Sequence, residues 1–425
     1  MRQLKDLKIG RRAFLQSGAA ALASAAIARP AFAVPKTIKI GLVAPQTGPL
    51  AIFSEQLLWT VEQIKAATGG QLDIGGVKHP LEIVLRDSQS NPNRAAEVAK
   101  NLILQEKVDL VTAFATPETV NPVADQCELS GVPCLSNDAP LEPYFFGRQG
   151  DPKKGFEWTY HYFFSAVTMA AEYFSSWDQV ATNKVVGALW PNDNDGQAFS
   201  HIFTELAAKR GYKIIDPGRF DLPSGNYSAQ IAAFKTAGVE IVAGVLPPPE
   251  FTAFSSAAAQ QNFRPKIVGM AKATEFPLAV APLGDRAAGL SVEVWWSPTH
   301  PYKSSLTGQS SQELADAYEK ATGKQWSMTL GFRHALFETA IDALKRTQKL
   351  DDPASIRDAI AKTELNSIVG PVNFGKGPYP NCCETPLVIG QWQKGKKFPF
   401  DLVNVDNKTT PAIPVGGKMV PIAYG

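Results

Sequence analysis

The pattern of apolar and polar positions changes character once, close to the N-terminus. After a basic, alanine-rich opening, short apolar runs of strand length alternate with longer segments whose apolar residues recur at helical spacing. The stretch IKIGLVAP (38–45) is a run of the first kind and predicts a buried parallel strand. The stretch NRAAEVAKNLILQEK is of the second kind, with Ala96, Ala99 and Leu102 on one helical face.

This alternation occurs twice. The first series ends near VPCLSND, and the second runs from KVVGALWP to KIVGMAK. The segment between them, EPYFFGRQGDPKKGFEW, is rich in glycine, proline and charge, and a helix is expected directly after it, over about 160–177. Strands separated by helices in both series predict two doubly wound parallel sheets.

The last third of the chain departs from this rhythm. The stretch AAGLSVEVWWSP predicts a strand, residues 311–347 predict mostly helix, and PASIRDAIAK predicts a short helix. The final stretch TPLVIGQWQKGKKFPFDLVNV alternates on both sides of Lys394-Gly395-Lys396, which predicts a hairpin.

Length and charge narrow the function classes. The chain has 425 residues, 44% of them hydrophobic and 19% charged, which suits two or three packed domains. The net charge is +2, but residues 1–33 alone carry +5, so the remainder is slightly acidic. A slightly acidic body argues against nucleic-acid binding as the main role.

Residues 1–33 have the order of an export signal. Arg11-Arg12 precede Phe14-Leu15, a short alanine-rich run follows, and Ala31-Phe32-Ala33 forms a small-x-small site. The paired arginines resemble the twin-arginine signal, which implies that the export machinery of that pathway is a partner. Cleavage is expected after Ala33, with a periplasmic product; the alternative is an ordinary amphipathic first helix.

Four cysteines remain, and an oxidising compartment would allow them to pair. Cys127 and Cys134 flank a predicted helix-to-strand turn, so a disulfide is one expectation there and two buried thiols are the other. The adjacent pair Cys382 and Cys383 cannot easily bond to each other without strain.

The stretch PNDNDGQ (191–197) has the composition of a calcium loop. With Gly196 at position 6 of an EF-hand loop, Pro191 would take position 1 and Ile202 position 12, and neither can ligate calcium through its side chain. A turn with a helix cap is therefore expected, and no metal site. Because the stretch follows a predicted strand, Trp190 and Asp195 are still candidates to face a ligand.

Catalytic motifs are missing from the sequence. It contains no G-x-S-x-G, no H-E-x-x-H, no phosphate-binding G-x-x-x-x-G-K-[ST] and no G-x-G-x-x-G after the first strand. A hydrolase is kept as the enzyme alternative, although no residue is a candidate nucleophile.

Several segments together carry a family resemblance. They are GLVAPQTGPLAIFS, DSQSNPNRAAEVAKNLI, DLVTAFATPETVNPVADQCELSGVPCLSNDAPLEP and WPNDNDGQAFSHIFTELAAKRGYKI. In order and spacing the chain resembles the type I periplasmic solute-binding proteins of ABC transporters, in the branch that includes the leucine/isoleucine/valine-binding proteins and their amide- and aromatic-acid-binding relatives.

The resemblance implies an architecture and a role. The fold would be α/β, two doubly wound parallel-sheet lobes joined by a multi-crossing hinge. An N-terminal lobe is expected from 34–158 and 287–372, and a C-terminal lobe from 159–286 and 373–425. The protein would be a monomeric, non-enzymatic receptor without cofactor that closes on a small carboxylate- or amide-bearing solute and delivers it to the permease and ATPase subunits of an importer. A periplasmic sensor that signals to a receptor is the alternative.

The resemblance also implies which residues contact the solute. In the first lobe they are Phe53, an aromatic after the first strand, and the residues after two further strands: Ala115 and Thr116, and Asn137, Asp138 and Ala139. In the second lobe, Lys272 stands where amino-acid binders of this family place an acid, and the next acid is Glu275. That departure favours an anionic group on the ligand over an α-amino group. Trp296 is the last candidate, since strand alternation forbids Trp295 and Trp296 from facing the same side.

Overall fold

The computed structural model describes residues 35–424. The expected twin-arginine signal (1–33) lies outside the described residues. The chain divides into two compact units, and the second of them, Thr37–Gly425, contains all of the helices and strands reported below. Among the described residues, no helix is long and apolar enough to cross a membrane.

The first sheet has seven strands in the order β14-β6-β5-β4-β1-β3-β2. All neighbours are parallel except β2 and β3, which form an antiparallel hairpin at one edge. The strands are β1 (Ile38–Ala44), β2 (Gln71–Ile74), β3 (Val77–Asp87), β4 (Leu110–Ala113), β5 (Cys134–Ser136), β6 (Thr159–Phe163) and β14 (Cys382–Glu384). Strands β4 and β5 are buried along their whole length, as expected for the centre of a parallel sheet.

The second sheet also has seven strands, in the order β16-β15-β11-β10-β9-β7-β8. The strands are β7 (Val185–Leu189), β8 (Lys213–Ile215), β9 (Ile241–Leu246), β10 (Ile267–Lys272), β11 (Ser291–Val294), β15 (Val388–Lys394) and β16 (Phe400–Asp406). Strands β7 to β11 are parallel, whereas β15 and β16 form the antiparallel hairpin expected from the sequence. A small antiparallel pair, β12 (Glu364–Ser367) and β13 (Gly370–Asn373), stands apart.

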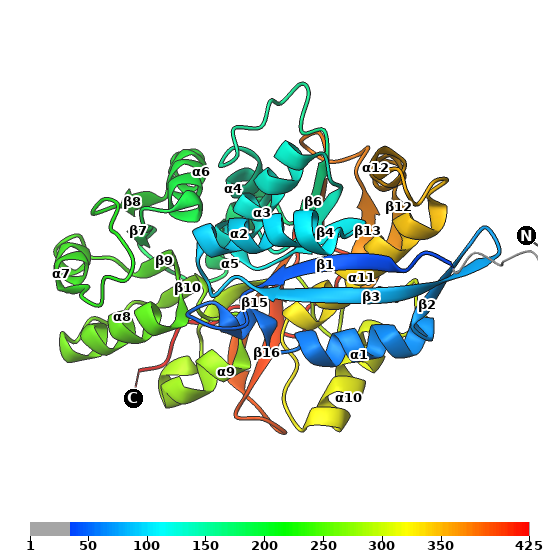
Figure 1. Ribbon diagram of the computed structural model, residues 1–425. Helices are drawn as coiled ribbons and strands as arrows, with labels where there is room; N and C mark the ends of the chain where they lie inside the picture. The colour runs from blue at the N-terminus through cyan, green and yellow to red at the C-terminus, as the bar shows by residue number, and fades with distance from the viewer. Residues whose placement is uncertain (1–34, 425) are drawn as a thin grey trace, which may run out of the picture. The chain divides into compact units, whose positions relative to one another are not determined.

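Helices cover the sheets, as Figure 1 shows for α2 and α3 above β1 and β3 and for α1 below them. The longer helices are α1 (Leu57–Thr68), α2 (Pro92–Asn101), α3 (Thr116–Ser130), α5 (Ala166–Trp177), α6 (Asn194–Arg210), α7 (Ser228–Thr236), α8 (Pro248–Gln260), α10 (Ser311–Thr322), α11 (Thr329–Arg346) and α12 (Pro353–Ala361). Short turns complete the set: α4 (Leu141–Phe145), α9 (Pro277–Val280), η1 (Ala51–Ser54), η2 (Leu102–Glu106) and η3 (Ala281–Ala287).

The predicted two-lobe α/β fold is confirmed, but the chain crosses between the sheets later than expected. Strand β6 belongs to the first sheet, β11 to the second and β14 to the first. The crossings therefore follow these strands, so the predicted boundaries at 158/159, 286/287 and 372/373 were each placed too early. The segment predicted as the start of a helix, TYHYF, is β6, because its aromatic residues pair in the sheet between β5 and β14.

Helix α11 is the central packing element. Fifteen of its 18 residues are buried, and its apolar residues belong to the cluster that includes residues of both sheets. A side chain at Gly331 would lie 2.4 Å from the indole of Trp296, so only glycine permits this approach of α11 to the end of β11. Arg333 lies in the enclosed part of α11 and its side chain is completely buried, which matters for the site described next.

Candidate ligand-binding site

A pocket lies where parallel strands of both sheets end. Its empty volume is ≈ 310 Å³. One wall comes from the first lobe and consists of Phe53, Thr116, Asp138, Pro140, Phe163 and Phe164. The other comes from the second lobe and consists of Asp195, Phe199, Val245, Ala271, Lys272, Glu275 and Glu293. The carboxyl ends of parallel strands are where such sheets bind ligands, because loops converge there and helix N-termini point at the same edge.

Left-handed backbone conformations gather at this pocket. Ala115, Thr116, Asp138 and Lys272 have φ angles of 74°, 65°, 61° and 63°. Threonine rarely adopts such a φ, because its branched side chain collides with the backbone. The amide N–H of Thr116 donates to the carbonyl of Asp138 at 2.8 Å and so joins the loops after β4 and β5. Strain of this kind persists where surrounding structure enforces it, which is common at binding sites.

Lys272 forms the charged part of the second wall. Its Nζ lies 2.7 Å from Asp195, 3.6 Å from Glu118 and 3.9 Å from Asp193. Glu118 is on α3 of the first lobe, so this lysine makes an ion pair across the cleft.

The pKa values of this cluster follow from burial and charge. Burial acts against the charged form of Lys272, but the nearby carboxylates, Asp195 foremost, raise its pKa. Burial raises the pKa of Asp195 to about 7 in spite of the lysine. Burial also opposes ionisation of Glu118, yet the lysine's charge leaves the Glu118 pKa below its usual value.

Two further carboxyl groups lie together behind the lysine. Glu275 Oε1 accepts the backbone N–H of Lys272 at 2.9 Å, and the Tyr173 hydroxyl donates to Glu293 Oε2 at 2.6 Å. Burial and then the charge of Glu293 raise the pKa of Glu275, and burial raises that of Glu293. Both shifts oppose ionisation, as expected for two carboxyl groups that interact in a buried setting.

The first wall has a different charged pair. The Asp138 carboxylate forms an ion pair with Arg333 of α11, and both side chains are completely buried. The guanidinium carbon of Arg333 lies 3.4 Å from the centre of the Phe114 ring. The pair therefore packs against the Phe114 ring and is shielded from solvent.

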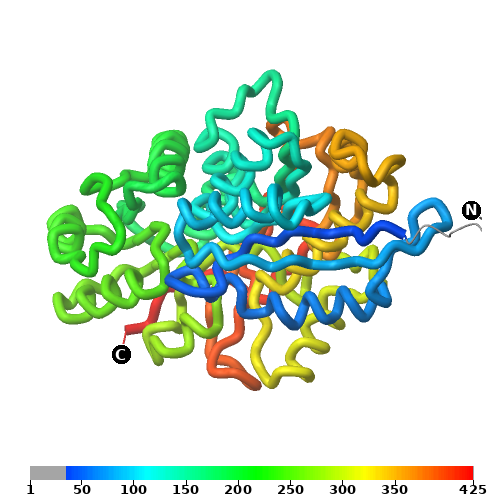
Figure 2. The backbone as a smooth tube through the Cα atoms, in the orientation of Figure 1, coloured from blue at the N-terminus to red at the C-terminus, as the bar shows by residue number. Residues whose placement is uncertain are grey.

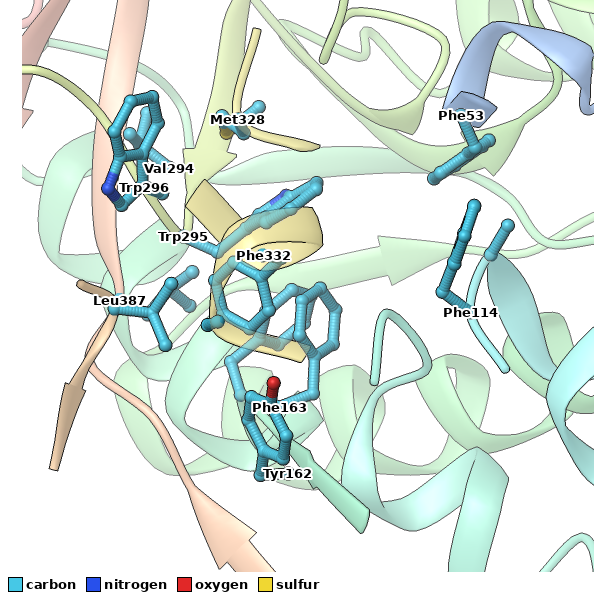
Figure 3. Close-up of a cluster of buried hydrophobic side chains, with 14 of the residues drawn as sticks. Phe53, Phe114, Tyr162, Phe163, Val294, Trp295, Trp296, Met328, Phe332 and Leu387 are labelled. Atoms are coloured by element: carbon cyan, nitrogen blue, oxygen red, sulfur yellow. The ribbon is translucent and has the colours of Figure 1, made fainter. Parts of the chain in front are cut away.

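Aromatic rings form much of the pocket surface. Phe53 packs edge-on against Phe276 of the second lobe, with ring centres 4.8 Å apart. Phe163 lies 4.2 Å from Phe164 and 5.1 Å from Trp295 between ring centres. Figure 3 shows Phe163, Trp295 and Phe332 close together, with Trp296 apart from them. The Trp295 and Phe332 rings meet edge to face, with centres 5.0 Å apart.

A wider pocket continues outward from the first one and shares Lys272 with it. Its empty volume is ≈ 1210 Å³. It is lined by five prolines and four acidic residues: Pro49, Pro191, Pro223, Pro247 and Pro249, and Glu118, Asp193, Asp221 and Glu250. The prolines fix the loop shape at the mouth, and Pro247 and Pro249 belong to a run of three prolines that directly follows β9.

The structure brings half of the predicted site residues into the pocket. These are Phe53, Thr116, Asp138, Asp195 and Lys272. Two others are core residues: Trp190 packs on Phe203 with ring centres 5.9 Å apart, and Trp296 packs on Trp326. Neither lines the pocket, because both indoles are buried within the packing of the lobes.

Three predicted residues frame the pocket without lining it. The Asn137 side chain donates to the Tyr162 hydroxyl at 3.0 Å and to the Phe332 carbonyl at 3.1 Å. The Ala139 carbonyl accepts from His161 Nε2 at 2.7 Å. Ala115 precedes α3 and is fully buried. The polar groups of Asn137 and Ala139 thus form hydrogen bonds with β6 and α11.

The pocket also contains residues that the sequence interpretation missed. They are Pro140, Phe163, Phe164, Phe199, Val245, Ala271 and Glu293, together with Arg333 below Asp138. A signal existed for Glu293 and Arg333, since each is a charged residue inside an apolar run: SVEVWW and GFRHALF.

Two other expectations can be compared with the structure. Cys127 and Cys134 are buried free thiols, so the alternative without a disulfide holds here; they adjoin each other, and burial raises the pKa of Cys127.

In PNDNDGQ, Asp193 is the N-cap of α6 and accepts the Gly196 N–H at 2.7 Å, which confirms the helix cap.

Comparison with known proteins now decides the family. Residues 37–397 match the sequence profile described as periplasmic binding protein. The chain belongs to the periplasmic binding protein family. Among solved structures it is similar to a leucine-binding protein, LivK, from Thermotoga maritima, with 18% identity over 88% of this chain and 99% of the other and a TM-score of 0.73.

Two further structures represent different ligands within the same fold. One is the branched-chain amino acid transporter substrate-binding protein LivJ from Streptococcus pneumoniae in complex with isoleucine, at 18% identity, with 87% of this chain and 100% of that chain covered and a TM-score of 0.69. The other is an ABC-transporter solute-binding protein from R. palustris in complex with 4-hydroxybenzoate, at 16% identity, 90% and 98% coverage, and a TM-score of 0.70. At these identities the likeness establishes the fold.

Proposed function

We propose that this periplasmic binding protein is an extracytoplasmic receptor for a small amino-acid-like solute with an apolar or aromatic body. The observation that carries the proposal is the pocket between the lobes, which combines phenylalanine rings with buried charged groups from both sides. Closure of two lobes on a solute requires contacts on both walls, because only a ligand that touches both can favour the closed form.

The charges of the pocket favour an amine on the ligand. Lys272 was expected to meet a ligand carboxylate, but its charge is already balanced by Asp195 and Glu118. Glu275 and Glu293 place two further carboxyl groups on the second wall, and carboxyl oxygens are the acceptors that an ammonium group needs, so the α-amino ligand disfavoured by the sequence becomes the better fit. A carboxylate would lie at the first wall, near the Thr116 hydroxyl and the N-terminus of α3.

A matched set of three ligands tests this assignment. L-phenylalanine carries both groups, 3-phenylpropanoate lacks the amine and phenethylamine lacks the carboxylate. In a thermal-shift assay, we expect phenylalanine or another apolar amino acid to raise the melting temperature by several degrees, and the truncated compounds to have little effect. An equal shift with 3-phenylpropanoate would overturn the role of the amine while leaving a solute receptor.

Variants place the binding in the cleft. Glu275→Gln removes the proposed ammonium partner and should abolish the shift, whereas Glu205→Gln, on the exposed face of α6, should leave it intact. A panel of amino acids, amides, aromatic carboxylates, dicarboxylates and nucleobases that gives no shift, with turnover of one compound, would contradict the receptor function and favour an enzyme.

We further propose export to the periplasm and delivery to the permease and ATPase of an ABC importer. The support is family membership together with the expected twin-arginine signal. Deletion of the gene should stop uptake of the radiolabelled ligand. Normal uptake combined with loss of a transcriptional response to the ligand would contradict import and favour the sensor role.

A further inference from the structure

A second pocket lies on the second lobe, away from the cleft. It is formed by α8, the loop that follows α8, η3 and the C-terminal residues 422–424. Its empty volume is ≈ 900 Å³, which includes space open to solvent. None of its lining residues lines the cleft pocket or the wider pocket at the mouth. In Figures 1 and 2 the C-terminal segment runs near α8, with which it lines this pocket.

The floor of this outer pocket is aromatic and aliphatic. Its main residues are Phe251, Phe254, Phe263, Val268 and Leu290, all of which are buried in the second lobe. Phe251 and Phe254 are stacked one helical turn apart, with ring centres separated by 6.3 Å. A concave surface with an apolar floor and a few polar groups at its edge is typical of small-molecule sites.

The wall made by the C-terminal segment is held in place by hydrogen bonds. The Ile422 N–H donates to the Lys266 carbonyl at 2.8 Å, and the Tyr424 hydroxyl donates to the Pro265 carbonyl at 2.7 Å. The pocket is therefore built by packed segments on each side, and it does not depend on a loose chain end.

The rim of the outer pocket is positively charged. Arg264 lies over the Tyr424 ring at 5.7 Å, and Arg286 is on η3. In the part of the chain that the structure describes, neither arginine has a carboxylate within ion-pair distance. The one acid at the rim, Asp285, is almost fully exposed and pairs with Lys394 at 3.2 Å.

We propose that the outer pocket binds a small amphipathic carboxylate, with its apolar body on the phenylalanine floor and its carboxylate at the arginines. Arginine suits this role because its guanidinium presents a planar set of donors that matches a carboxylate. The proposal is independent of the cleft ligand, since the two pockets share no residue.

Calorimetric titration of the full chain with 4-phenylbutyrate tests the proposal. The neutral analogue 4-phenylbutyramide has the same body without the charge. We expect the acid to bind, the amide to bind about tenfold more weakly, and added salt to weaken only the acid. Equal binding of acid and amide would overturn the role of the arginines.

Two kinds of variant locate the binding. Ala258→Trp fills the pocket from α8, and the double variant Arg264→Gln/Arg286→Gln removes the rim charge without changing the core. Each should weaken 4-phenylbutyrate binding about tenfold, while Arg94→Gln, at a half-buried arginine of the first lobe, should not. Since the double variant changes only surface residues, it remains decisive if Ala258→Trp fails to fold.

Binding of 4-phenylbutyrate in the cleft would contradict the proposal. If Phe53→Ala abolishes 4-phenylbutyrate binding and the outer-pocket variants leave it unchanged, the compound binds in the cleft and the proposal is wrong. Absence of any heat of binding at millimolar 4-phenylbutyrate would also overturn it. Protection of residues 251–263 and 420–424 from hydrogen exchange by the compound would support it.

Discussion

The two walls of the cleft hold charge in different ways. In the first wall, Asp138 and Arg333 pair with each other in a fully buried setting, and within residues 35–424 neither side chain has another ion-pair partner. In the second wall, Lys272 pairs with three carboxylates, and burial raises the pKa values of Asp195, Glu275 and Glu293. The first wall therefore contains one enclosed ion pair, the fixed pair, whereas the second contains several carboxyl groups whose pKa values depend on their charged neighbours.

The largest effect is expected from breaking the fixed pair. Arg333→Met leaves the Asp138 carboxylate buried without a counter-charge, which should lower the free energy of unfolding by about 3–5 kcal/mol. Urea denaturation measures this change in the free energy of unfolding. The double variant Arg333→Met/Asp138→Asn removes both charges and should recover most of the loss. A loss below about 1 kcal/mol in the single variant would contradict the fixed pair.

The second wall should show itself in the pH dependence of stability. Because the pKa of Asp195 is raised from 3.8 to about 7, the native state holds a proton that the unfolded state has lost across this range. The stabilisation is complete below pH 3.8 and is lost as the pH rises towards 7, by up to about 4 kcal/mol.

The variant Asp195→Asn isolates this contribution. It should flatten the decline in unfolding free energy between pH 4 and pH 7, as measured by denaturation at several pH values. Asp316→Asn, on the exposed side of α10, serves as the control and should keep the slope of the wild type. Equal slopes in wild type and Asp195→Asn would show that Asp195 titrates outside this range.

A smaller effect is expected from the strained backbone of the first wall. Thr116→Gly allows the positive φ without collision and should raise the unfolding free energy by about 1 kcal/mol. The same change removes the hydroxyl, so the ligand-induced thermal shift should decrease. Thr204→Gly, at an exposed position in the middle of helix α6, should instead destabilise by about 1 kcal/mol. Destabilisation by Thr116→Gly would mean that strain is not stored there.

The smallest effect concerns the ion pair that joins the walls. Glu118→Gln removes the attraction to Lys272 across the cleft, so the closed form should lose about 0.5–1 kcal/mol and ligand affinity should fall two- to fivefold. Calorimetric titration measures the affinity, with Glu205→Gln as the control. Unchanged affinity would show that this pair does not contribute to closure.

The pocket residues that could be predicted from the sequence are those whose position next to a strand is visible in a short stretch of the chain. Phe53, Thr116, Asp138, Asp195 and Lys272 all follow predicted strands, and the carboxyl edge of a parallel sheet is fixed by that pattern. Asn137, Trp190 and Trp296 follow or end strands in the same way, yet their side chains turn into the core. Position along a strand predicts the edge of the sheet on which a residue lies, but it does not predict which groups the side chain contacts.

The sequence alone determined the two α/β halves, the closing hairpin and the edge on which the pocket lies, because these depend on periodicity and turns within short windows. The tertiary structure decided the rest. Crossing points, the burial of Arg333 under Asp138 and the neutralisation of Lys272 by Glu118 join residues far apart in the chain. Such contacts depend on how helices and sheets pack, and charge at a buried site depends on every group packed around it.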